Sequence, residues 1–455
     1  MHYISRDIPG CCLALCVFLA SGASADDFRK GIDAFNNEDY VTALAEWQPL
    51  AERGDLNAMY NVGLIYDEGL GVEVDKEKAL EWYLPPAEEG DVAAQFSVAT
   101  IYDFGYGVAE DNQKAIYWYT AAAQQADEQA QFNLGVMYAS GEGVDVDAEA
   151  AINWYELSAD QGHVPAQYNL AYIYDIGELV PEDNQLAKRW YLKASDQGDM
   201  DAQYALALMY DEGDGFAEDD VAAVKWYKLA ADQGDVRAQF NLAIMYDVGE
   251  GMPENDELAI KWYTAAAEQG HTNAQLNLGL MYEGGEGTKV DPILAMSWYR
   301  KAADQGLTEA QYAVALMFDE GVGMAEDNVA AIAWYTRAAE QGDAQAQNNL
   351  GAMYDSGEGI PEDNDAAFKW YTLSANQGNA TAQNNLGTMY YAGEGTDTDK
   401  PEAYKWFYIA GELGNDDARD NSLVVKKNLR RSELKKAKKL AVRWLEEFEN
   451  GTSTL

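Results

Sequence analysis

The stretch AQFNLGVMYASGEGVDVDAEAAINWYELSADQG, residues 130–162, decides the fold of this chain. Its first part places Leu134 and Tyr138 on one apolar stripe at the helical period. Gly141 then ends that helix, because glycine adopts the left-handed conformation at a helix C-terminus without strain. A second amphipathic helix carries Trp154 on its apolar side. The stretch therefore predicts two helices joined by a turn.

The same pattern recurs along the chain. Ten Trp residues follow one another at intervals of 36 residues, and Tyr follows every one of them except the last. A fixed period of this length is typical of solenoids, in which each repeat packs only against its neighbours. Ten such repeats fill residues 55–414, and we interpret the Trp series as their structural spine. The series is Trp82, Trp118, Trp154, Trp190, Trp226, Trp262, Trp298, Trp334, Trp370 and Trp406.

Each repeat carries the same motif at fixed spacing, seen for example as Ala346-Gln347, Leu350-Gly351, Tyr354, Gly357-Glu358-Gly359, Ala367, Trp370-Tyr371 and Gln377-Gly378. This motif resembles the Sel-one-like repeat (SLR) family of the exported bacterial type, a relative of the tetratricopeptide repeats. The resemblance implies an all-α fold, a right-handed α-solenoid superhelix of about ten 36-residue helix-turn-helix repeats with N- and C-terminal capping units. It also implies protein–protein contacts, and no one reaction.

The N-terminal residues have the pattern of a secretory signal peptide. Arg6 precedes an apolar run over residues 11–20 that is too short to span a bilayer, and a small-residue stretch ends at Ala25. We predict a signal peptide over residues 1–25, cleaved after Ala25, and a periplasmic or secreted protein without a stable membrane span. A retained membrane anchor is the alternative. All three Cys lie in this segment, so we expect no thiol chemistry in the mature chain.

The residues outside the repeats predict two caps. Residues 26–54 form a divergent N-terminal helical hairpin, residues 415–449 form C-terminal capping helices, and residues 450–455 form a disordered tail. From Arg419 onward the chain has ten basic and five acidic residues. This basic cap is either a solvated helix that offsets the acidic body, or a docking site for an anionic surface or for the acidic body of another copy.

Departures from the motif are few. Leu179 replaces the second loop Gly of its repeat, and Met59 stands where later repeats carry Gln. Pro85 and Pro86 lie inside the second helix of the first repeat. Because proline lacks a backbone donor, we expect a kinked or shortened helix and an irregular first repeat, unless the two prolines mark the true end of that helix.

The chain is strongly acidic, with 78 Asp and Glu against 31 Lys and Arg and a formal net charge of −47. Like charges repel, so this composition argues against binding of nucleic acid or anionic lipid and favours a basic, cationic or metal-rich partner. The mature chain has only His163 and His271, three repeats apart, and it lacks nucleophile-elbow, Walker and dinucleotide-binding motifs. We predict no enzyme activity, no cofactor and no assigned metal site.

Acidic residues follow the aromatic residue at the end of the first helix in eight of ten repeats. An anion there opposes the helix dipole by roughly 0.3–1 kcal/mol, so the repetition needs an explanation. Three interpretations stay open: a carboxylate ladder for a basic peptide or polycation, Ca²⁺ binding around residues 211–220, or solvated turn-forming loops. The residues are Asp67, Asp103, Asp175, Asp211, Asp247, Glu283, Asp319 and Asp355.

A second column follows the Gln of each repeat and changes from aromatic residues to Asn. It either lines the concave groove of the solenoid or packs against the next repeat. We predict a non-enzymatic exported scaffold or adaptor that binds another protein, such as a basic segment, in this groove. The alternatives are an envelope polysaccharide- or cell-wall-binding adaptor and a Ca²⁺-responsive acidic repeat protein. The candidate groove residues are Phe132, Tyr168, Tyr204, Phe240, Tyr312, Asn348, Asn384, Asp175, Asp211, Asp247, Glu283, Asp319 and Asp355.

Overall fold

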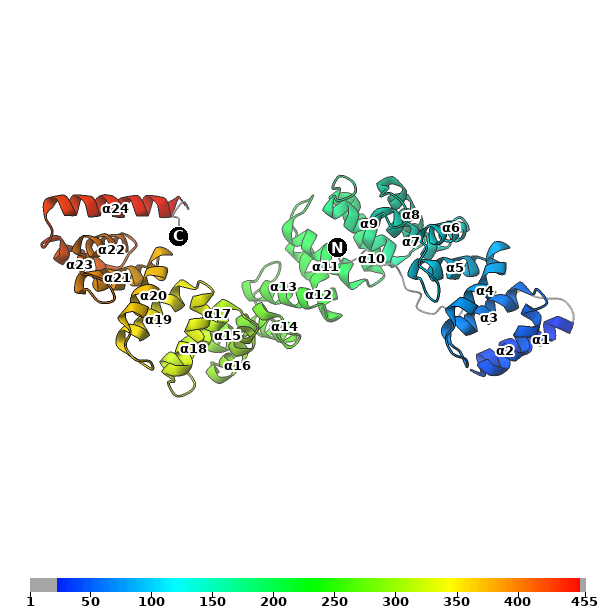
Figure 1. Ribbon diagram of the computed structural model, residues 1–455, viewed down its shortest axis with the longest axis horizontal. Helices are drawn as coiled ribbons and strands as arrows, with labels where there is room; N and C mark the ends of the chain where they lie inside the picture. Colours follow the sequence, from blue (N-terminus) through cyan, green and yellow to red (C-terminus); the bar gives the residue numbers. More distant parts are fainter. Residues whose placement is uncertain (1–22, 451–455) are drawn as a thin grey trace. The chain divides into compact units, whose positions relative to one another are not determined.

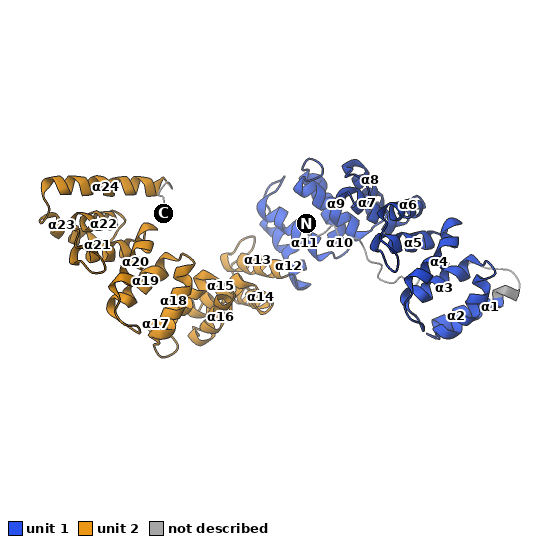
Figure 2. Ribbon diagram, viewed as in Figure 1, with its two compact units in different colours: residues 1–235 blue, residues 236–455 orange. Residues whose placement is uncertain are grey.

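The computed structural model describes residues 23–450, and every regular element in that range is a helix. The predicted signal peptide and the predicted tail lie outside the described residues, apart from the backbone of residues 23–25 and Asn450. The helices form two compact units, residues 1–235 and 236–455 (Figure 2). Within each unit, helices that follow one another in the chain pack together, as the repeats predict for an all-α solenoid.

The first compact unit holds an N-terminal hairpin and five repeat hairpins (Figure 1). We call the first helix of each repeat hairpin its A helix and the second its B helix. The bounds are α1 Ala23–Asn36, α2 Tyr40–Ala51, α3 Leu56–Glu68, α4 Lys76–Glu88, α5 Val92–Phe104, α6 Asn112–Ala123, α7 Glu128–Ser140, α8 Ala148–Asp160, α9 Val164–Ile176, α10 Asn184–Asp196, α11 Met200–Glu212 and α12 Asp220–Asp232.

The second compact unit holds five further repeat hairpins and two closing helices (Figure 1). The bounds are α13 Val236–Val248, α14 Asp256–Glu268, α15 Thr272–Gly284, α16 Pro292–Asp304, α17 Thr308–Glu320, α18 Asn328–Glu340, α19 Ala344–Ser356, α20 Asn364–Asn376, α21 Ala380–Ala392, α22 Lys400–Glu412, α23 Asp416–Lys426 and α24 Arg431–Glu449.

Polar caps set the limits of the repeat helices. In α11 the Asp199 side chain accepts a hydrogen bond from the Ala202 amide, and Gly213 ends the helix with a φ of 68°. Asp219 caps the start of α12 in the same way. Such caps satisfy backbone groups that a helix end leaves unpaired, at about 1 kcal/mol each. The Asp residues of the motif therefore mark where the helices begin, and the loop Gly residues mark where the A helices end.

The deepest side chain of a repeat hairpin is the Tyr that follows the Trp. Tyr227, Tyr299 and Tyr335 are 0% exposed, whereas Trp154 is only partly buried. A Cβ atom at Gly279, on the facing A helix, would lie 2.5 Å from the Tyr299 ring. The Gly and Ala column of the A helices is therefore where the Tyr rings pack. Tyr shares the role of structural spine that the sequence assigned to Trp alone.

Basic side chains cover the Trp rings in the later repeats, from Trp190 to Trp406. Seven successive Trp residues have a Lys or Arg over the ring, an arrangement worth about 0.5–1 kcal/mol at exposed sites. Several of the few cations of this acidic chain thus have a structural role. The pairs are Lys193 with Trp190, Lys225 with Trp226, Lys261 with Trp262, Lys301 with Trp298, Arg337 with Trp334, Lys369 with Trp370 and Lys405 with Trp406.

The expected shortening at Pro85 and Pro86 is wrong, whereas the alternative, that the prolines lie at the end of the helix, agrees with the structure. Helix α4 runs through both prolines and has 13 residues, like most other B helices. Both prolines lie in its last turn, where their fixed φ suits the helix and only the final backbone bonds are lost. Pro86 is buried there.

The closing helix α24 packs against α22. Its Trp444 ring meets Trp406 edge-on at 5.9 Å between centroids, and its Ala441 is 0% exposed. The Phe448 ring occupies the space beside Gly378 that lies open at the equivalent Gly of most other repeats. This apolar side covers the end of the repeat core. Among residues 23–450, no helix is long and apolar enough to cross a membrane.

Candidate functional site

One side of the A helices stays accessible and carries the candidate residues. On α15, Leu276, Leu280 and Glu283 lie at positions i, i+4 and i+7, so they share one stripe, and Leu280 is 50% exposed. Leu278, on another side of the helix, is 0% exposed. We call the surface formed by these three positions, in the repeats of either compact unit, the A-helix face of that unit. Its first position is the predicted aromatic and Asn column, and its third is the predicted acidic column.

Sequence reasoning missed the second position of the A-helix face. It is aliphatic in four successive A helices, and in each of them the side chain keeps some exposure. The sequence could have revealed that an aliphatic residue recurs every 36 residues at this position, but not that it is exposed. The four residues are Leu208, Ile244, Leu280 and Leu316. The face therefore combines apolar and acidic positions.

The acidic column is held by the buried Tyr of the same hairpin. In all eight acidic repeats, the Tyr hydroxyl donates to the carboxylate 16 residues earlier, at 2.6–3.5 Å. A hydrogen bond to a charged group contributes about 1.5–3 kcal/mol, which exceeds the dipole cost of roughly 0.3–1 kcal/mol. The pairs are Tyr83–Asp67, Tyr119–Asp103, Tyr191–Asp175, Tyr227–Asp211, Tyr263–Asp247, Tyr299–Glu283, Tyr335–Asp319 and Tyr371–Asp355.

The two repeats without the acid test this explanation within the chain. Where Tyr391 takes the acidic position, the partner 16 residues later is Phe407, which has no hydroxyl. Where Ala139 takes it, Tyr155 keeps its hydroxyl, and that buried hydroxyl has no hydrogen-bond partner among the described residues. Acid and hydroxyl are therefore present or absent together in nine of ten repeats.

An Asn on the next A helix extends this contact between hairpins. The Asn277 side-chain amide donates to the Tyr263 hydroxyl at 3.0 Å, and this hydroxyl donates to Asp247 at 3.2 Å. Burial is the largest cause that raises the pKa of Tyr263, so the hydroxyl stays protonated and remains a donor. Burial likewise raises the pKa of Asp211, against the opposing hydrogen bond from Tyr227. The Asp247 carboxylate is therefore held in place by two successive side-chain hydrogen bonds, which we call the relay.

The aromatic column lies mostly against the same Tyr rings. Each of its aromatic groove candidates has its ring centroid 5.6–6.0 Å from the Tyr ring of its own hairpin. Phe132 is 1% exposed, so burial removes it from the accessible part of the face, and Tyr168 is 9% exposed. The partly exposed members are Tyr204, Phe240 and Tyr312.

The Asn members of that column bond to neighbouring Asn residues. Asn421 donates to Asn384 at 3.0 Å, and Asn385 donates to Asn348 at 3.3 Å. The first contact joins α23 to α21, and the second joins α21 to α19. The two candidates remain partly exposed on the A-helix face.

A ladder of Gln side chains, also missed from the sequence, fastens the hairpins together. Gln305 donates to Gln275 at 2.8 Å, and Gln275 donates to the Ala267 carbonyl of the preceding hairpin at 3.0 Å. The ladder ends where one or both partners change. Met59 faces the position of Glu89, and Gln383 faces Leu413, which leaves the Gln383 carbonyl without a partner.

The two His residues cap helices. The Nδ1 atom of His271 accepts from the Ala274 amide at 3.2 Å, and His163 bonds to Ala166 in the same way. Asp residues hold this cap position in most other hairpins. The His271 ring stacks on Phe240 with 4.3 Å between centroids. The structure therefore gives both His residues a structural role.

Acidification is expected to weaken the His271 cap. Burial lowers the pKa of this imidazole below its usual value, so its contribution is complete above the unfolded pKa, near 6.5, and is lost as pH falls through the folded pKa. Between pH 7.5 and 5, hydrogen exchange at the Ala274 amide should lose protection worth about 1 kcal/mol. His271→Asp, the residue of other hairpins, should keep protection constant. An equal loss in this variant would contradict the assignment.

Two carboxylates in the predicted Ca²⁺ region have partners within the protein. Asp214 accepts from the Asn184 side-chain amide at 2.6 Å, and Asp219 caps α12. These bonds account for two of the crowded acids without an ion. Calcium binding remains a prediction, which calorimetry at millimolar Ca²⁺ would check.

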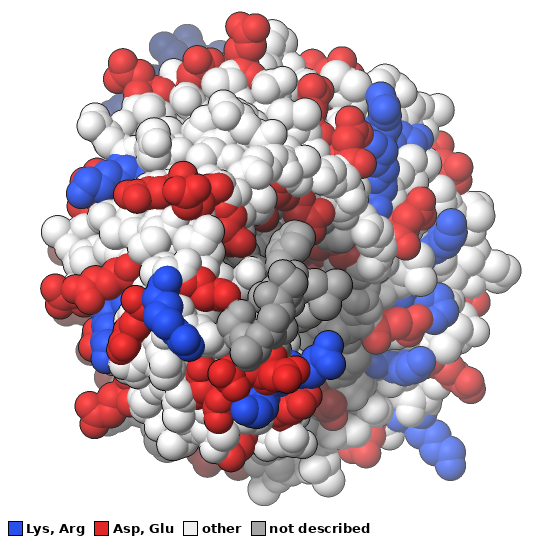
Figure 3. All heavy atoms as spheres, turned by 90° about the vertical axis from the view of Figure 1, so that its right-hand side faces the viewer, with Lys and Arg blue, Asp and Glu red and all other residues white. Residues whose placement is uncertain are grey.

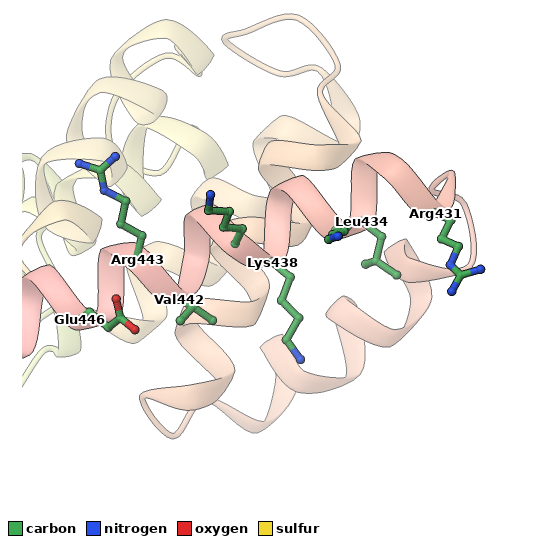
Figure 4. Close-up of a pocket in the computed structure, with 8 residues that line it drawn as sticks. Arg431, Leu434, Lys438, Val442, Arg443 and Glu446 are labelled. Carbon is green, nitrogen blue, oxygen red and sulfur yellow. The ribbon is translucent and has the colours of Figure 1, made fainter.

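Charge is distributed unevenly between the repeats and the C-terminal cap. Acidic side chains are spread over the face of the molecule shown in Figure 3, with fewer basic ones among them. On α24, Arg431, Lys438 and Arg443 extend away from the helix axis (Figure 4), whereas Ala437 and Ala441 are buried. The three basic residues line a shallow depression of about 680 Å³ together with Leu434 and Val442.

Comparison with known proteins identifies the repeat. The family model described as Sel1 repeat matches residues 56–91, 92–127, 128–163, 164–199, 201–235, 236–271, 272–307, 308–343, 344–379 and 380–415. A sequence search finds no matching curated protein.

Two solved structures are similar over most of their length. One is c5321, described as a protective antigen present in uropathogenic Escherichia coli strains and displaying an SLR fold. It has 32% identity and a TM-score of 0.64, over 90% of this chain and 96% of that chain. The other is a Sel1 repeat protein from Oxalobacter formigenes, with 33% identity and a TM-score of 0.56, over 68% of this chain and 90% of that chain.

Proposed function

The chain belongs to the Sel1 repeat family, and from this premise we propose that it is a non-enzymatic exported adaptor that binds another protein on its A-helix face. A repeat solenoid of this family typically mediates protein–protein interactions. Export rests on the signal-peptide pattern of residues 1–25 and places the adaptor in the periplasm or outside the cell.

The observation that carries the proposal is the fixed carboxylate on each acidic repeat. A buried Tyr holds Asp247 and Glu283 on the A-helix face, and a carboxylate has more acceptor sites than the single one that the Tyr uses. Ile244 and Leu280 lie about one turn before these acids on the same two helices and offer apolar contact. This combination suits an extended partner segment that carries Lys or Arg together with apolar side chains.

Removing these charges without removing the Tyr contacts tests the proposal. The variant Asp247→Asn, Glu283→Gln, Asp319→Asn, with all three positions in the second compact unit, keeps an oxygen acceptor for each Tyr, so the fold should persist. Partners are first crosslinked in the cell envelope and purified with the chain. Their affinity for this variant should be at least about 10-fold lower than for the wild type, since each charge pair contributes up to about 1 kcal/mol. Charge reversal to Lys would instead break the Tyr bonds and confuse binding with folding.

A matched control neutralises three exposed acids on B helices. Glu257→Gln, Glu268→Gln and Glu340→Gln change the net charge equally but lie outside the A-helix face. Their partner affinity should stay within about 2-fold of the wild type. Equal weakening in both triple variants would show that only net charge matters and would overturn the assignment to this face.

The partly exposed rings of Tyr204, Phe240 and Tyr312 favour a second candidate function, binding of envelope polysaccharide or cell wall. Aromatic faces supply apolar contact with a polar edge, which sugar rings require. A glycan array would support this candidate if Tyr312→Ala removed a signal. A silent array beside a specific protein partner would exclude it.

A further inference from the structure

Helix α24 carries a stripe of two cations with an aliphatic side chain between them. Arg431, Leu434 and Lys438 lie at positions i, i+3 and i+7, so they share one side of the helix, and all three line its shallow depression (Figure 4). Both cations are exposed, and Leu434 is partly exposed. Lys438 lies over the Tyr408 ring, 5.0 Å from its centroid. We call these three residues the α24 stripe.

The cations of the α24 stripe lack acids nearby in the sequence. Residues 426–443 hold nine basic residues and one acidic residue, although the whole chain has 78 acids and only 31 basic residues. The single acid, Glu433, pairs with Arg430. Within the described residues, Arg431 forms no ion pair. This end of an acidic chain therefore offers positive charge to a surface of opposite sign.

Helix α8, in the first compact unit, carries the opposite charges at the same spacing. Glu149, Ile152 and Glu156 also lie at positions i, i+3 and i+7, and they line an open depression of about 770 Å³. Both acids are exposed, and Ile152 is partly exposed. Their repeat, residues 127–162, has eight acids and is the only one of the ten without Lys or Arg. We call these three residues the α8 stripe.

The two stripes are complementary in charge and in spacing. Seven residues of an α-helix span about 10 Å, so the two charges are equally far apart on α24 and on α8. A parallel alignment of the helices would place each cation opposite an acid and Leu434 against Ile152. Each charge would then have a partner, and both aliphatic groups would leave water.

We propose that the α24 stripe of one copy of this chain docks on the α8 stripe of a second copy. A second copy is favoured over an anionic lipid surface because the acidic repeats would face the whole lipid surface and be repelled by it. Repulsion between two acidic copies is screened beyond about 8 Å at physiological salt, so the pairs in direct contact decide the association. The two stripes differ, and such a contact lets further copies add end to end. It leaves the A-helix face of both units free.

Sedimentation velocity of the full chain at increasing concentration tests this contact. The sedimentation coefficient of the wild type should rise with concentration at low salt and return to the monomer value at high salt, because salt screens exposed charges. Reversal by salt distinguishes this contact from association through exposed apolar surface. The α24 variant, Arg431→Gln with Lys438→Gln, should self-associate about 10-fold more weakly, and so should the α8 variant, Glu149→Gln with Glu156→Gln.

Two control variants change the net charge equally but leave both stripes intact. Lys427→Gln with Lys436→Gln alters two exposed lysines that do not line the depression of α24. Glu257→Gln with Glu268→Gln alters two exposed acids of α14. Self-association of both controls should stay within about 2-fold of the wild type.

Mixing the two weakened variants decides whether the stripes bind each other. The α24 variant retains its α8 stripe, and the α8 variant retains its α24 stripe. A fluorescently labelled α24 variant should therefore bind the α8 variant with the affinity of the wild-type contact and form pairs without larger species. Mixed variants that associate no more tightly than either variant alone would overturn the inference.

A wild type that stays monomeric up to about 100 µM at low salt would also overturn the inference. An α24 stripe bound within its own chain would give this result, because such a contact does not depend on concentration. Phosphatidylglycerol vesicles test the lipid alternative. If the wild type stays monomeric but binds these vesicles, and the α24 variant does not bind them, the stripe binds lipid and the inference falls. None of these measurements requires the partner of the A-helix face, so the proposed function is tested separately.

Discussion

Replacing Tyr263 by Ala is expected to lower the free energy of unfolding of the second compact unit by about 3–5 kcal/mol. The ring is 1% exposed, and its removal leaves a cavity between α13 and α14. It also deprives Asp247 and Asn277 of their common partner. Denaturant unfolding followed by circular dichroism measures the loss. Because repeats stabilise one another only through neighbours, we also expect the transition to broaden.

Two variants separate the ring from the hydroxyl. Tyr263→Phe retains the packing and removes only the relay, so it should cost about 1–2 kcal/mol. Val329→Ala, at a side chain that is 67% exposed, should change stability by less than about 0.5 kcal/mol. If Tyr263→Phe were as stable as the wild type, the bond to Asp247 would contribute nothing, and the acidic column would need another explanation.

Truncation of the chain after Arg430 is expected to destabilise the second compact unit by about 5 kcal/mol and to cause self-association. The deletion removes α24 and with it Trp444, which covers Trp406. It also exposes the core residues against which Ala441 packs. A solenoid end without its cap exposes apolar surface of the kind that associates. Sedimentation velocity and denaturant unfolding measure the two effects.

The basic side of α24 provides the control for this deletion. Lys435→Gln, Lys436→Gln and Lys439→Gln leave Trp444 and Ala441 in place, because the side chains of these three lysines are exposed. Their stability should remain within about 1 kcal/mol of the wild type. A truncated chain that stayed monomeric and equally stable would show that α24 is not a cap.

The fold could be predicted from the sequence because one period fixes every hairpin. The Trp-Tyr pairs and the Gly turns recur every 36 residues. Ten copies of the same pattern therefore support the prediction of each helix of the hairpin. The tertiary contacts of the motif were harder to predict. Tyr263 reaches Asp247 from the other helix of its hairpin, and Gln305 reaches Gln275 from 30 residues away, so neither pair shares a local helical stripe. Only the joint changes at the exceptional repeats could have revealed them.

The candidate site was predicted in part. The acidic column lies on the A-helix face, but its repetition first serves the fold, because each carboxylate accepts a hydrogen bond from a buried Tyr. The residues of the aromatic column occupy the same position of the repeat but differ in exposure, from 1% at Phe132 to partial exposure at Tyr312. Burial depends on how the next hairpin packs, and a column of residue types does not contain that information.

The central claim, that the A-helix face binds the partner, is tested most directly by site-specific photocrosslinking. A photoreactive phenylalanine analogue at Leu280, 50% exposed on this face, is compared with the same analogue at Ile293, 70% exposed on a B helix. We predict that Leu280 yields a specific protein adduct in the cell envelope and that Ile293 does not. An adduct formed from Ile293 and absent from Leu280 would contradict the account.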